Sequence, residues 1–221
     1  MLLENYYYYF QSVLSPKFCD EIIDYGTRHT LNTALTHVDD PKGGDFKTNL
    51  NELTEDEKNH VLFKRKSNIA WLKDAWIYKE IHPYITEANK LAGWNFDWDW
   101  SESAQFTKYD TGQFYNWHAD SHPRPYQGKN KSINELGKIR KLSVTVSLSD
   151  PKDYDGGNLE FSFRNNADFE ENKDNAIHTC MEVRPRGSII VFPSFVWHRV
   201  TPVTRGTRYS LVVWNLGYPF K

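Results

Sequence analysis

The stretch YDTGQFYNWHAD (residues 109–120) joins a turn to a strand that ends in two potential metal ligands. The turn signal is DTG (residues 110–112), and the aromatic residues after it favour an extended strand over residues 114–120. Because side chains two positions apart in a strand point to the same face, His118 and Asp120 can approach one ion together. On a helix the same spacing would separate them. The stretch therefore predicts a β-rich core that carries a metal-binding group.

Similar runs of β-forming residues recur through the second part of the chain. They occur at residues 104–109, 141–148, 158–163, 187–193, 196–201 and 208–215. Turn signals that contain Gly, Asp or Arg separate many of them. Residues 94–100 alternate aromatic residues with Asn and Asp, which predicts a further strand with one aromatic face. This number of strands is typical of a jelly roll.

The first part of the chain has helical patterns instead. Ser15 and Pro16 form a helix start, and apolar residues follow at helical spacing. A second helix is predicted from about Trp71 to Leu91, and Pro83 would kink or divide it. The polar residues 37–60 are predicted to form a long loop.

Together these patterns predict an α+β fold with N-terminal helices that support a double-stranded β-helix, or jelly-roll, core. We expect residues 1–221 to form one domain, with 1–93 as mainly helical support and 94–221 as the jelly-roll core. A single β-rich domain of this length is ordinary.

Composition limits the classes of function. The net charge is −2 and the pI about 6.4, so the chain lacks the overall basic character of nucleic-acid-binding proteins. We find no signal peptide and no apolar stretch long enough to span a membrane. There are only two cysteines, which fits a reducing compartment. We therefore expect a cytoplasmic protein.

A third metal ligand and an anion-binding residue lie near the end of the chain. His198 is flanked by β-forming residues, and two imidazoles with one carboxylate are the ligands that hold one face of the metal in a non-haem Fe(II) oxygenase. Arg208 follows a predicted hairpin and would lie on the neighbouring strand, where its planar guanidinium suits a carboxylate. The structural alternatives are a hydrogen-bonded core histidine and a buried ion pair.

Three segments, in order, resemble the prolyl 4-hydroxylase-like branch of the Fe(II)/2-oxoglutarate dioxygenases. Residues 109–120 resemble its Tyr-x-x-Gly-x-x-Tyr-x-x-His-x-Asp motif at every fixed position. Residues 154–161 resemble its Gly-Gly-x-Leu segment, and residues 192–208 resemble its second half. Parts of the N-terminal region are also similar, so the resemblance covers nearly the whole chain.

The resemblance implies a cofactor, a cosubstrate and a role for each residue. His118, Asp120 and His198 would be the ligands of Fe(II), and Arg208 and Tyr109 would hold 2-oxoglutarate. Trp214 would line the cofactor pocket, whereas Ser147 stands where some members have a second tyrosine. The reaction would use O2, release succinate and CO2, and take ascorbate as a candidate reductant.

The substrate that the resemblance implies is a peptide or protein, with proline as the first target. Two other classes stay open: an oxygenase of a small molecule or nucleobase, and a jelly-roll module that binds without catalysis. The sequence indicates no oligomeric state. His122 could face the metal or lie in a lid. Trp117 and Trp197 could line the substrate groove or pack in the core. The aromatic face of residues 94–100 could be a substrate platform, although a core face fits better. The basic residues between Lys129 and Lys141 are expected to be a solvated loop.

Overall fold

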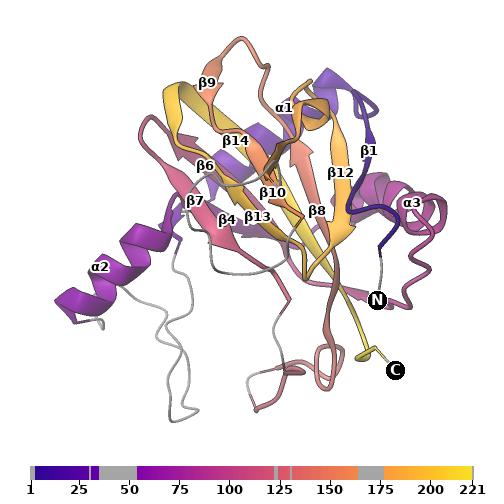
Figure 1. Cartoon of the computed structure of the whole chain (residues 1–221). Helices are drawn as coiled ribbons and strands as arrows, with labels where there is room; N and C mark the ends of the chain where they lie inside the picture. The colour runs from indigo at the N-terminus through magenta and orange to yellow at the C-terminus, as the bar shows by residue number, and fades with distance from the viewer. Residues whose placement is uncertain are drawn as a thin grey trace.

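A computed structural model describes residues 3–29, 31–34, 54–121, 124–129, 131–163 and 177–220. Within these ranges the chain folds into two antiparallel sheets that face each other (Figure 1). The larger sheet contains β1 (Tyr8–Phe10), β2 (Asn32–Thr33), β4 (Asn68–Leu72), β5 (Trp100–Ser101), β6 (Ala104–Asp110), β8 (Ile139–Ser147), β9 (Tyr154–Gly156), β12 (Ile189–Pro193) and β14 (Val203–Gly217). The smaller sheet contains β3 (Arg65–Lys66), β7 (Phe114–His118), β10 (Leu159–Ser162), β11 (Ile177–Thr179) and β13 (Trp197–Val200).

The order of the strands is that of a jelly roll, as predicted. The larger sheet runs β1-β12-β8-β14-β6-β4-β2, with β5 and β9 also paired to β14, and the smaller sheet runs β11-β10-β13-β7-β3. Neighbours in both sheets are therefore far apart in sequence. Four strands that precede residue 93 complete these sheets, so the N-terminal region supplies strands as well as helices.

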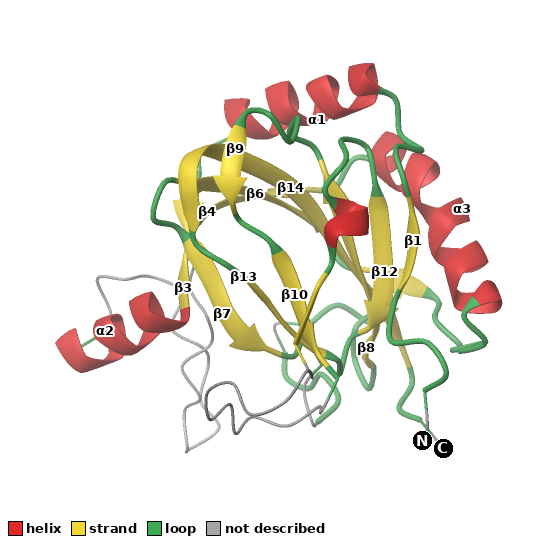
Figure 2. Ribbon diagram, turned by 45° about the horizontal axis from the view of Figure 1, so that its top comes forward, coloured by secondary structure: helices red, strands yellow, loops and turns green. Residues whose placement is uncertain are grey.

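Helices cover the outer face of the larger sheet. They are α1 (Pro16–Arg28), α2 (Glu55–Lys64) and α3 (Ala75–Leu91), of which α1 and α3 lie on that face and α2 lies apart (Figure 2). The predicted start of α1 is confirmed, because the Ser15 hydroxyl accepts a hydrogen bond from the backbone N–H of Phe18 at 3.1 Å. Gly26 lets α1 approach the sheet, since a Cβ there would lie 2.4 Å from the ring of Phe106.

The core has two layers of apolar side chains. One lies between α1, α3 and the larger sheet and includes Ile22, Ile81 and Val144, all fully buried. The other lies between the two sheets and includes Phe161 and Phe192. The metal ligands belong to this inner space between the sheets.

Some predicted boundaries in the first half were wrong. The second helix begins at Ala75, because Trp71 belongs to β4, and the helix continues through Pro83 without dividing. The predicted loop 37–60 includes the start of α2, and its residues 37–53 lie outside the described part of the chain.

The alternating segment 94–100 is not a strand. Only Trp100 joins β5, and Asn95 has a φ of 51°, which breaks an extended run. The Asn89 side chain binds both the N–H and the carbonyl of Phe96 at 2.9 Å. Trp94 and Phe96 are nevertheless buried, so the expected core role of these aromatics is correct for two of the four.

Candidate metal centre and cosubstrate pocket

Three side chains meet at one end of the space between the sheets. His118 is the last residue of β7, and His198 lies opposite it on β13 in the antiparallel register. Asp120 follows two residues after His118. Its two carboxylate oxygens lie 3.6 Å from His118 Nε2 and 3.5 Å from His198 Nε2. One ligand atom from each residue falls within 4.8 Å of the others, which is a spacing that can hold a metal ion.

Local hydrogen bonds orient both imidazoles. His118 Nδ1 lies 2.8 Å from the carbonyl oxygen of Asn116, and His198 Nδ1 lies 2.9 Å from that of Val196. A carbonyl oxygen can only accept, so each Nδ1 carries the proton and each Nε2 presents a lone pair to the cluster. Each ring is therefore held in the tautomer that binds a metal.

The strand predicted over 114–120 ends at His118, so Asp120 does not share its face by strand alternation. Instead, the backbone N–H groups of Asp120 and Ser121 both donate to the carbonyl of Ser194, at 2.8 and 2.9 Å. The Ser143 hydroxyl donates to the Asp120 carboxylate at 2.7 Å. A turn fixed by neighbouring strands therefore aims this carboxylate.

The charge states of the cluster suit a cation. Burial, followed by the nearby His198, holds the pKa of His118 well below its usual range, so this imidazole is neutral at pH 7. Burial would raise the pKa of Asp120, but the two histidines, Arg140 and the Ser143 hydrogen bond outweigh it and lower that pKa to about 2. The cluster thus offers the neutral imidazole of His118 and the carboxylate of Asp120, beside the imidazole of His198.

Arg208 reaches the inner space from the opposite sheet, and the predicted hairpin with β13 is wrong. β14 crosses from β13 into the larger sheet, where Arg208 pairs in register with Tyr109 of β6. Both residues are 3% exposed, and the guanidinium carbon lies 5.5 Å from the centre of the Tyr109 ring. Arg208 Nη1 donates to Ser210 at 3.2 Å, and Ser210 lies opposite Ser147 on β8.

The Gly-Gly segment makes room for this arginine. A Cβ at Gly157 would lie 2.8 Å from the Cδ of Arg208, and the glycine has a φ of 57°. Among the described residues, no carboxylate lies within 4.0 Å of the Arg208 guanidinium. A buried guanidinium in this setting is suited to a bound anion.

Sequence reasoning missed a set of charged side chains near the metal cluster. Arg140 forms a two-point ion pair with Glu102, at 2.6 and 2.9 Å, and its guanidinium lies 3.9 Å from the ring of Trp214. Lys138, Arg140 and Lys141 belong to the stretch that we expected to be a solvated loop. Lys138, just before β8, and Lys141 within it are buried, and the side chain of Arg140 is only 14% exposed, which contradicts that expectation for these three. The sequence contained a signal for this burial, because Arg140 and Lys141 directly precede a run of β-forming residues and can therefore lie in the same strand.

Trp214 is buried, opposite Ser143 of β8, with its ring centre 6.1 Å from that of Trp71. Its indole N–H has no hydrogen-bond partner among the described residues. Trp117 lies under the guanidinium of Arg199 at 4.7 Å. His122, which was considered as a further ligand, lies outside the described residues.

Another stacked group lies against the metal cluster. The ring of Tyr115 stacks on His118 with centres 3.5 Å apart, and Arg65 lies 4.4 Å from the centre of the Tyr115 ring. Arg65 is buried, and its Nη2 has no partner among the described residues. Sequence analysis identified Tyr115 as a motif position but assigned Arg65 no role in the site.

The geometry agrees with comparisons to known proteins. Residues 104–215, just over half of the chain, match the profile of the 2OG-Fe(II) oxygenase superfamily. A PKHD-type hydroxylase of Herminiimonas arsenicoxydans is 36% identical over 110 residues, which is 49% of this chain and 41% of that protein. A PKHD-type hydroxylase of Methylobacillus flagellatus is 35% identical over 112 residues, 49% of this chain and 40% of that protein. These matches thus span about two fifths of the length of the curated relatives.

Solved structures share the fold over nearly the whole chain. A viral collagen prolyl hydroxylase from Paramecium Bursaria Chlorella virus-1 has a TM-score of 0.61 and 17% identity, with 97% of both chains covered. A prolyl-4-hydroxylase of Pseudomonas putida has a TM-score of 0.56 and 19% identity, with 96% of this chain and 92% of that chain covered. At these identities the likeness shows the jelly-roll fold.

The family implies Fe(II), 2-oxoglutarate and O2, and the residues fit these groups. Two imidazole nitrogens and a carboxylate are the donor set of non-haem Fe(II) oxygenases. A buried arginine on the facing sheet is placed to receive a carboxylate. By the match over residues 104–215, the chain belongs to the 2OG-Fe(II) oxygenase superfamily.

Proposed function

We propose that the protein is an Fe(II)- and 2-oxoglutarate-dependent dioxygenase that hydroxylates a peptide or protein, with proline as the first candidate target. The observation that carries this proposal is the placement of the His118, Asp120 and His198 cluster opposite the buried guanidinium of Arg208. The balanced reaction takes a substrate C–H group, 2-oxoglutarate and O2 to the alcohol, succinate and CO2.

Each residue has a defined part in this reaction. His118 and His198 bind the metal through Nε2, and Asp120 binds it through a carboxylate oxygen that Ser143 helps to hold. Arg208 and Tyr109 bind the distal carboxylate of 2-oxoglutarate. Trp214 lines the mouth. Bound Fe(II) supplies the activation of O2 that couples oxidative decarboxylation of the cosubstrate to substrate hydroxylation.

The support for a peptide substrate comes from similar proteins, because the sequences of the loops do not indicate a substrate. A prolyl hydroxylase of Trichoplax adhaerens that shares the fold, with a TM-score of 0.57 and 14% identity, was solved with a hypoxia inducible factor peptide fragment. Ascorbate is the candidate reductant that would keep the metal as Fe(II).

We further propose that residues 1–221 act as one oxygenase domain in the cytoplasm. Strands before residue 93 pair with strands after it in both sheets, which supports a single unit. Both cysteines are free and buried, which fits a reducing compartment. No helix in the described ranges is both long and apolar enough to cross a membrane.

The test compares His118→Ala with His29→Ala. His29 also binds a backbone carbonyl through Nδ1 but lies at the end of α1, so it is a matched control for the loss of an imidazole. The proteins are incubated with Fe(II), 2-oxoglutarate and a panel of peptides, and the peptides are searched for the mass of one added oxygen. We expect peptide-dependent succinate formation by the parent protein and by His29→Ala, and none by His118→Ala. Full activity of His118→Ala would exclude the proposed metal site.

A further inference from the structure

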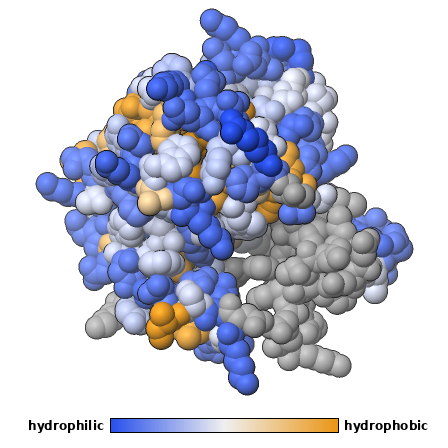
Figure 3. All heavy atoms as spheres, turned by 180° about the vertical axis from the view of Figure 1, so that it is seen from behind, coloured by the Kyte–Doolittle hydropathy of each residue, from blue (hydrophilic) through white to orange (hydrophobic). Residues whose placement is uncertain are grey.

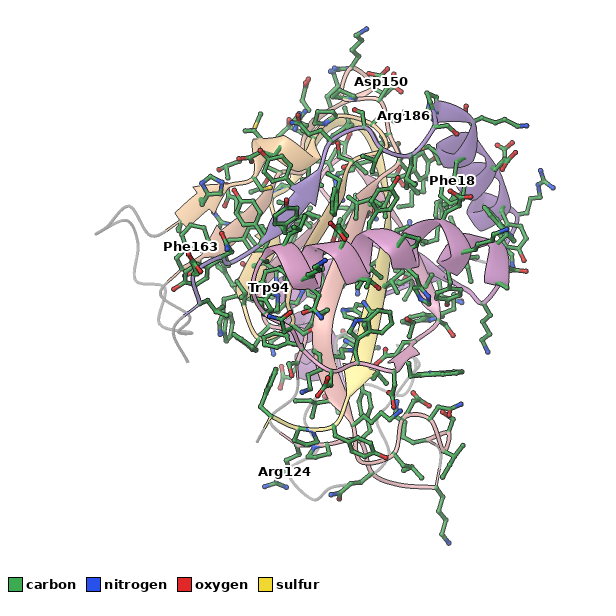
Figure 4. All side chains as sticks on the ribbon, turned by 90° about the vertical axis from the view of Figure 1, so that its right-hand side faces the viewer. Phe18, Trp94, Arg124, Asp150, Phe163 and Arg186 are labelled. Atoms are coloured by element: carbon green, nitrogen blue, oxygen red, sulfur yellow. The ribbon has the colours of Figure 1, made fainter. Side chains whose placement is uncertain are left out.

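A cavity lies beside the larger sheet, between α3 and the segment that leads into β6. It has a volume of about 820 Å³, which is the size of a ligand or peptide side-chain site. One wall is the face of α3 that carries Tyr78, Lys79 and His82, and another is the segment 98–103 with two tryptophans. Figure 4 shows α3 across the front of this side, with the loop that carries Arg124 below it. Seen from behind, the hydrophobic areas form separate patches among hydrophilic ones (Figure 3).

Hydrogen bonds fix the walls of this cavity before any ligand binds. The Tyr78 hydroxyl donates to the carbonyl of Glu102 at 2.9 Å and accepts from the N–H of Ala104 at 2.9 Å. His82 Nε2 lies 3.0 Å from the Ser101 hydroxyl, which donates to Asn215 of β14 at 2.7 Å. The site is thus preorganised, and a ligand would not have to order it.

The aromatic surface of the cavity suits an extended proline-containing chain. Trp100 is 40% exposed, and Trp98 lies edge-on to the ring of His82 at 5.4 Å. Grooves lined by indole and phenol rings recognise proline-rich segments, because these segments are already extended and lose little entropy on binding. Both tryptophans occupy the wall that faces α3.

The unpaired charge on the lining is positive. Each acidic residue of the lining has a cationic partner outside it: Asp99 pairs with Lys138 at 2.6 Å, Glu102 with Arg140 at 2.6 Å, and Glu135 with Lys131 at 3.3 Å. Lys73 and Lys79 also line the cavity, and within the described part of the chain no carboxylate lies within 4.0 Å of either ammonium. Charge complementarity therefore favours an acidic ligand.

The cavity shares a wall with the proposed substrate mouth. Glu102 lines the cavity, and its carboxylate binds Arg140, whose guanidinium covers Trp214 beside the metal cluster. The rim residue Glu135 belongs to the loop that follows Asp120. The cavity and the metal centre are therefore neighbours across the Glu102–Arg140 ion pair, since Arg140 also donates to the carbonyl of Asp120 at 3.5 Å.

We propose that this cavity is an exosite that binds an acidic, proline-containing segment of the polypeptide substrate, away from the residue that is hydroxylated. The proposal rests on the proposed function and specifies its substrate class: polypeptides with acidic proline-rich sequence near the target. Trp98 and Trp100 contact the proline rings, and Lys73 and Lys79 neutralise the acidic side chains.

The experiment measures binding and turnover separately. The binding probe is a fluorescein-labelled peptide of alternating proline and glutamate, with a proline–lysine peptide as its control, titrated onto the full chain loaded with Fe(II) and 2-oxoglutarate without O2. The variants are the double change Lys73→Glu/Lys79→Glu and the single change Trp100→Ala. The matched control is Lys90→Glu, an exposed lysine of the same helix that does not line the cavity.

We expect the acidic probe to bind more tightly than the basic one. The lysine double variant should weaken its binding by roughly three- to tenfold through lost ion pairs, and Trp100→Ala by a similar factor through lost ring contact. Lys90→Glu should leave its affinity unchanged. His118→Ala should also bind it normally, because the exosite does not need the metal. Equal affinity for both probes, or equal effects of the cavity variants and Lys90→Glu, would overturn the exosite. The expected binding pattern without oxygen addition to any peptide would instead overturn the proposed hydroxylation.

Discussion

Arg208→Met is the change that best separates a cosubstrate-binding arginine from a structural one. The guanidinium is 3% exposed and donates one described hydrogen bond, to the neutral hydroxyl of Ser210. If its anionic partner is 2-oxoglutarate, the cosubstrate-free protein contains a buried charge without a counter-charge. Methionine has similar length and no charge, so it should stabilise the cosubstrate-free protein and weaken cosubstrate binding.

The contacts of Arg208 give the expected size of both effects, the loss of cosubstrate affinity and the gain in stability. Two charge-assisted hydrogen bonds to the distal carboxylate contribute about 1.5–3 kcal/mol each, so their loss should raise the Kd of 2-oxoglutarate by at least roughly 100-fold. Replacing a buried ionic group by an apolar one of similar volume can raise the free energy of unfolding by about 1–4 kcal/mol. For a chain of this size each kcal/mol shifts the Tm by roughly 2–4 °C.

The assay is thermal unfolding of the metal-loaded protein with and without 2-oxoglutarate, supported by urea unfolding. The parent protein should show a lower Tm than Arg208→Met without cosubstrate and a large rise in Tm with it, and the variant should show no rise. Arg205→Met is the control, because Arg205 lies on the same strand in an exposed ion pair with Asp155. A loss of stability in Arg208→Met without cosubstrate would refute the reasoning, since it would show that the guanidinium already has a structural partner.

Three further predictions concern the metal cluster and the packing of α1. In the metal-free protein, folding depresses the pKa of His118, so the stability that this residue contributes is present above the unfolded pKa of about 6.5 and is lost as the pH falls below it. The free energy of unfolding should change by at most about 1.4 kcal/mol per pH unit for this one group. Urea unfolding at several pH values should show a weaker pH dependence in His118→Gln, and an equal pH dependence in both proteins would contradict this assignment. Ser143→Ala removes a hydrogen bond to Asp120 and should weaken Fe(II) binding by about 10–100-fold in a metal titration, whereas unchanged affinity would show that the carboxylate is held without it. Gly26→Ala forces a methyl group against Phe106 and should lower the free energy of unfolding by about 1–3 kcal/mol, and an unchanged urea midpoint would show that α1 can move away freely.

The metal ligands could be predicted from sequence because their chemistry is distinctive and their flanking residues are β-forming. Strand alternation gave the right pair of residues, His118 and Asp120, for a partly wrong reason. The carboxylate is aimed by a turn whose N–H groups bind Ser194, a residue 74 positions later in the chain. No local pattern around Asp120 reports that contact, because it depends on which strands become neighbours.

The sheet that carries Arg208 could not be predicted in the same way. Pro202 and Arg205-Gly206 favour a turn, and a turn between two strands is compatible with a hairpin or with a crossover to the other sheet. The crossover is favoured because β14 forms hydrogen bonds with β6 and β8 of the larger sheet over most of its length. The strand predicted over residues 94–100 was wrong for a related reason. The half-buried side chain of Asn89 binds the backbone of Phe96, so the aromatic residues keep their period-two spacing without forming a strand.

The distribution of buried charge explains why the facing sheets suit an anionic cosubstrate as well as a cation. Arg65 and Arg208 are both buried, and among the described residues neither has a carboxylate within 4.0 Å, whereas Arg140 is neutralised by Glu102. Asp120 is a buried carboxylate and belongs to the metal cluster. Adding a divalent metal alone would increase the excess of positive charge, and adding a dicarboxylate with it would offset that excess. The electrostatics therefore predict that Fe(II) and 2-oxoglutarate bind with positive coupling: the Kd of 2-oxoglutarate should be lower in the presence of the metal, and by linkage the Kd of the metal should fall by the same factor when 2-oxoglutarate is present.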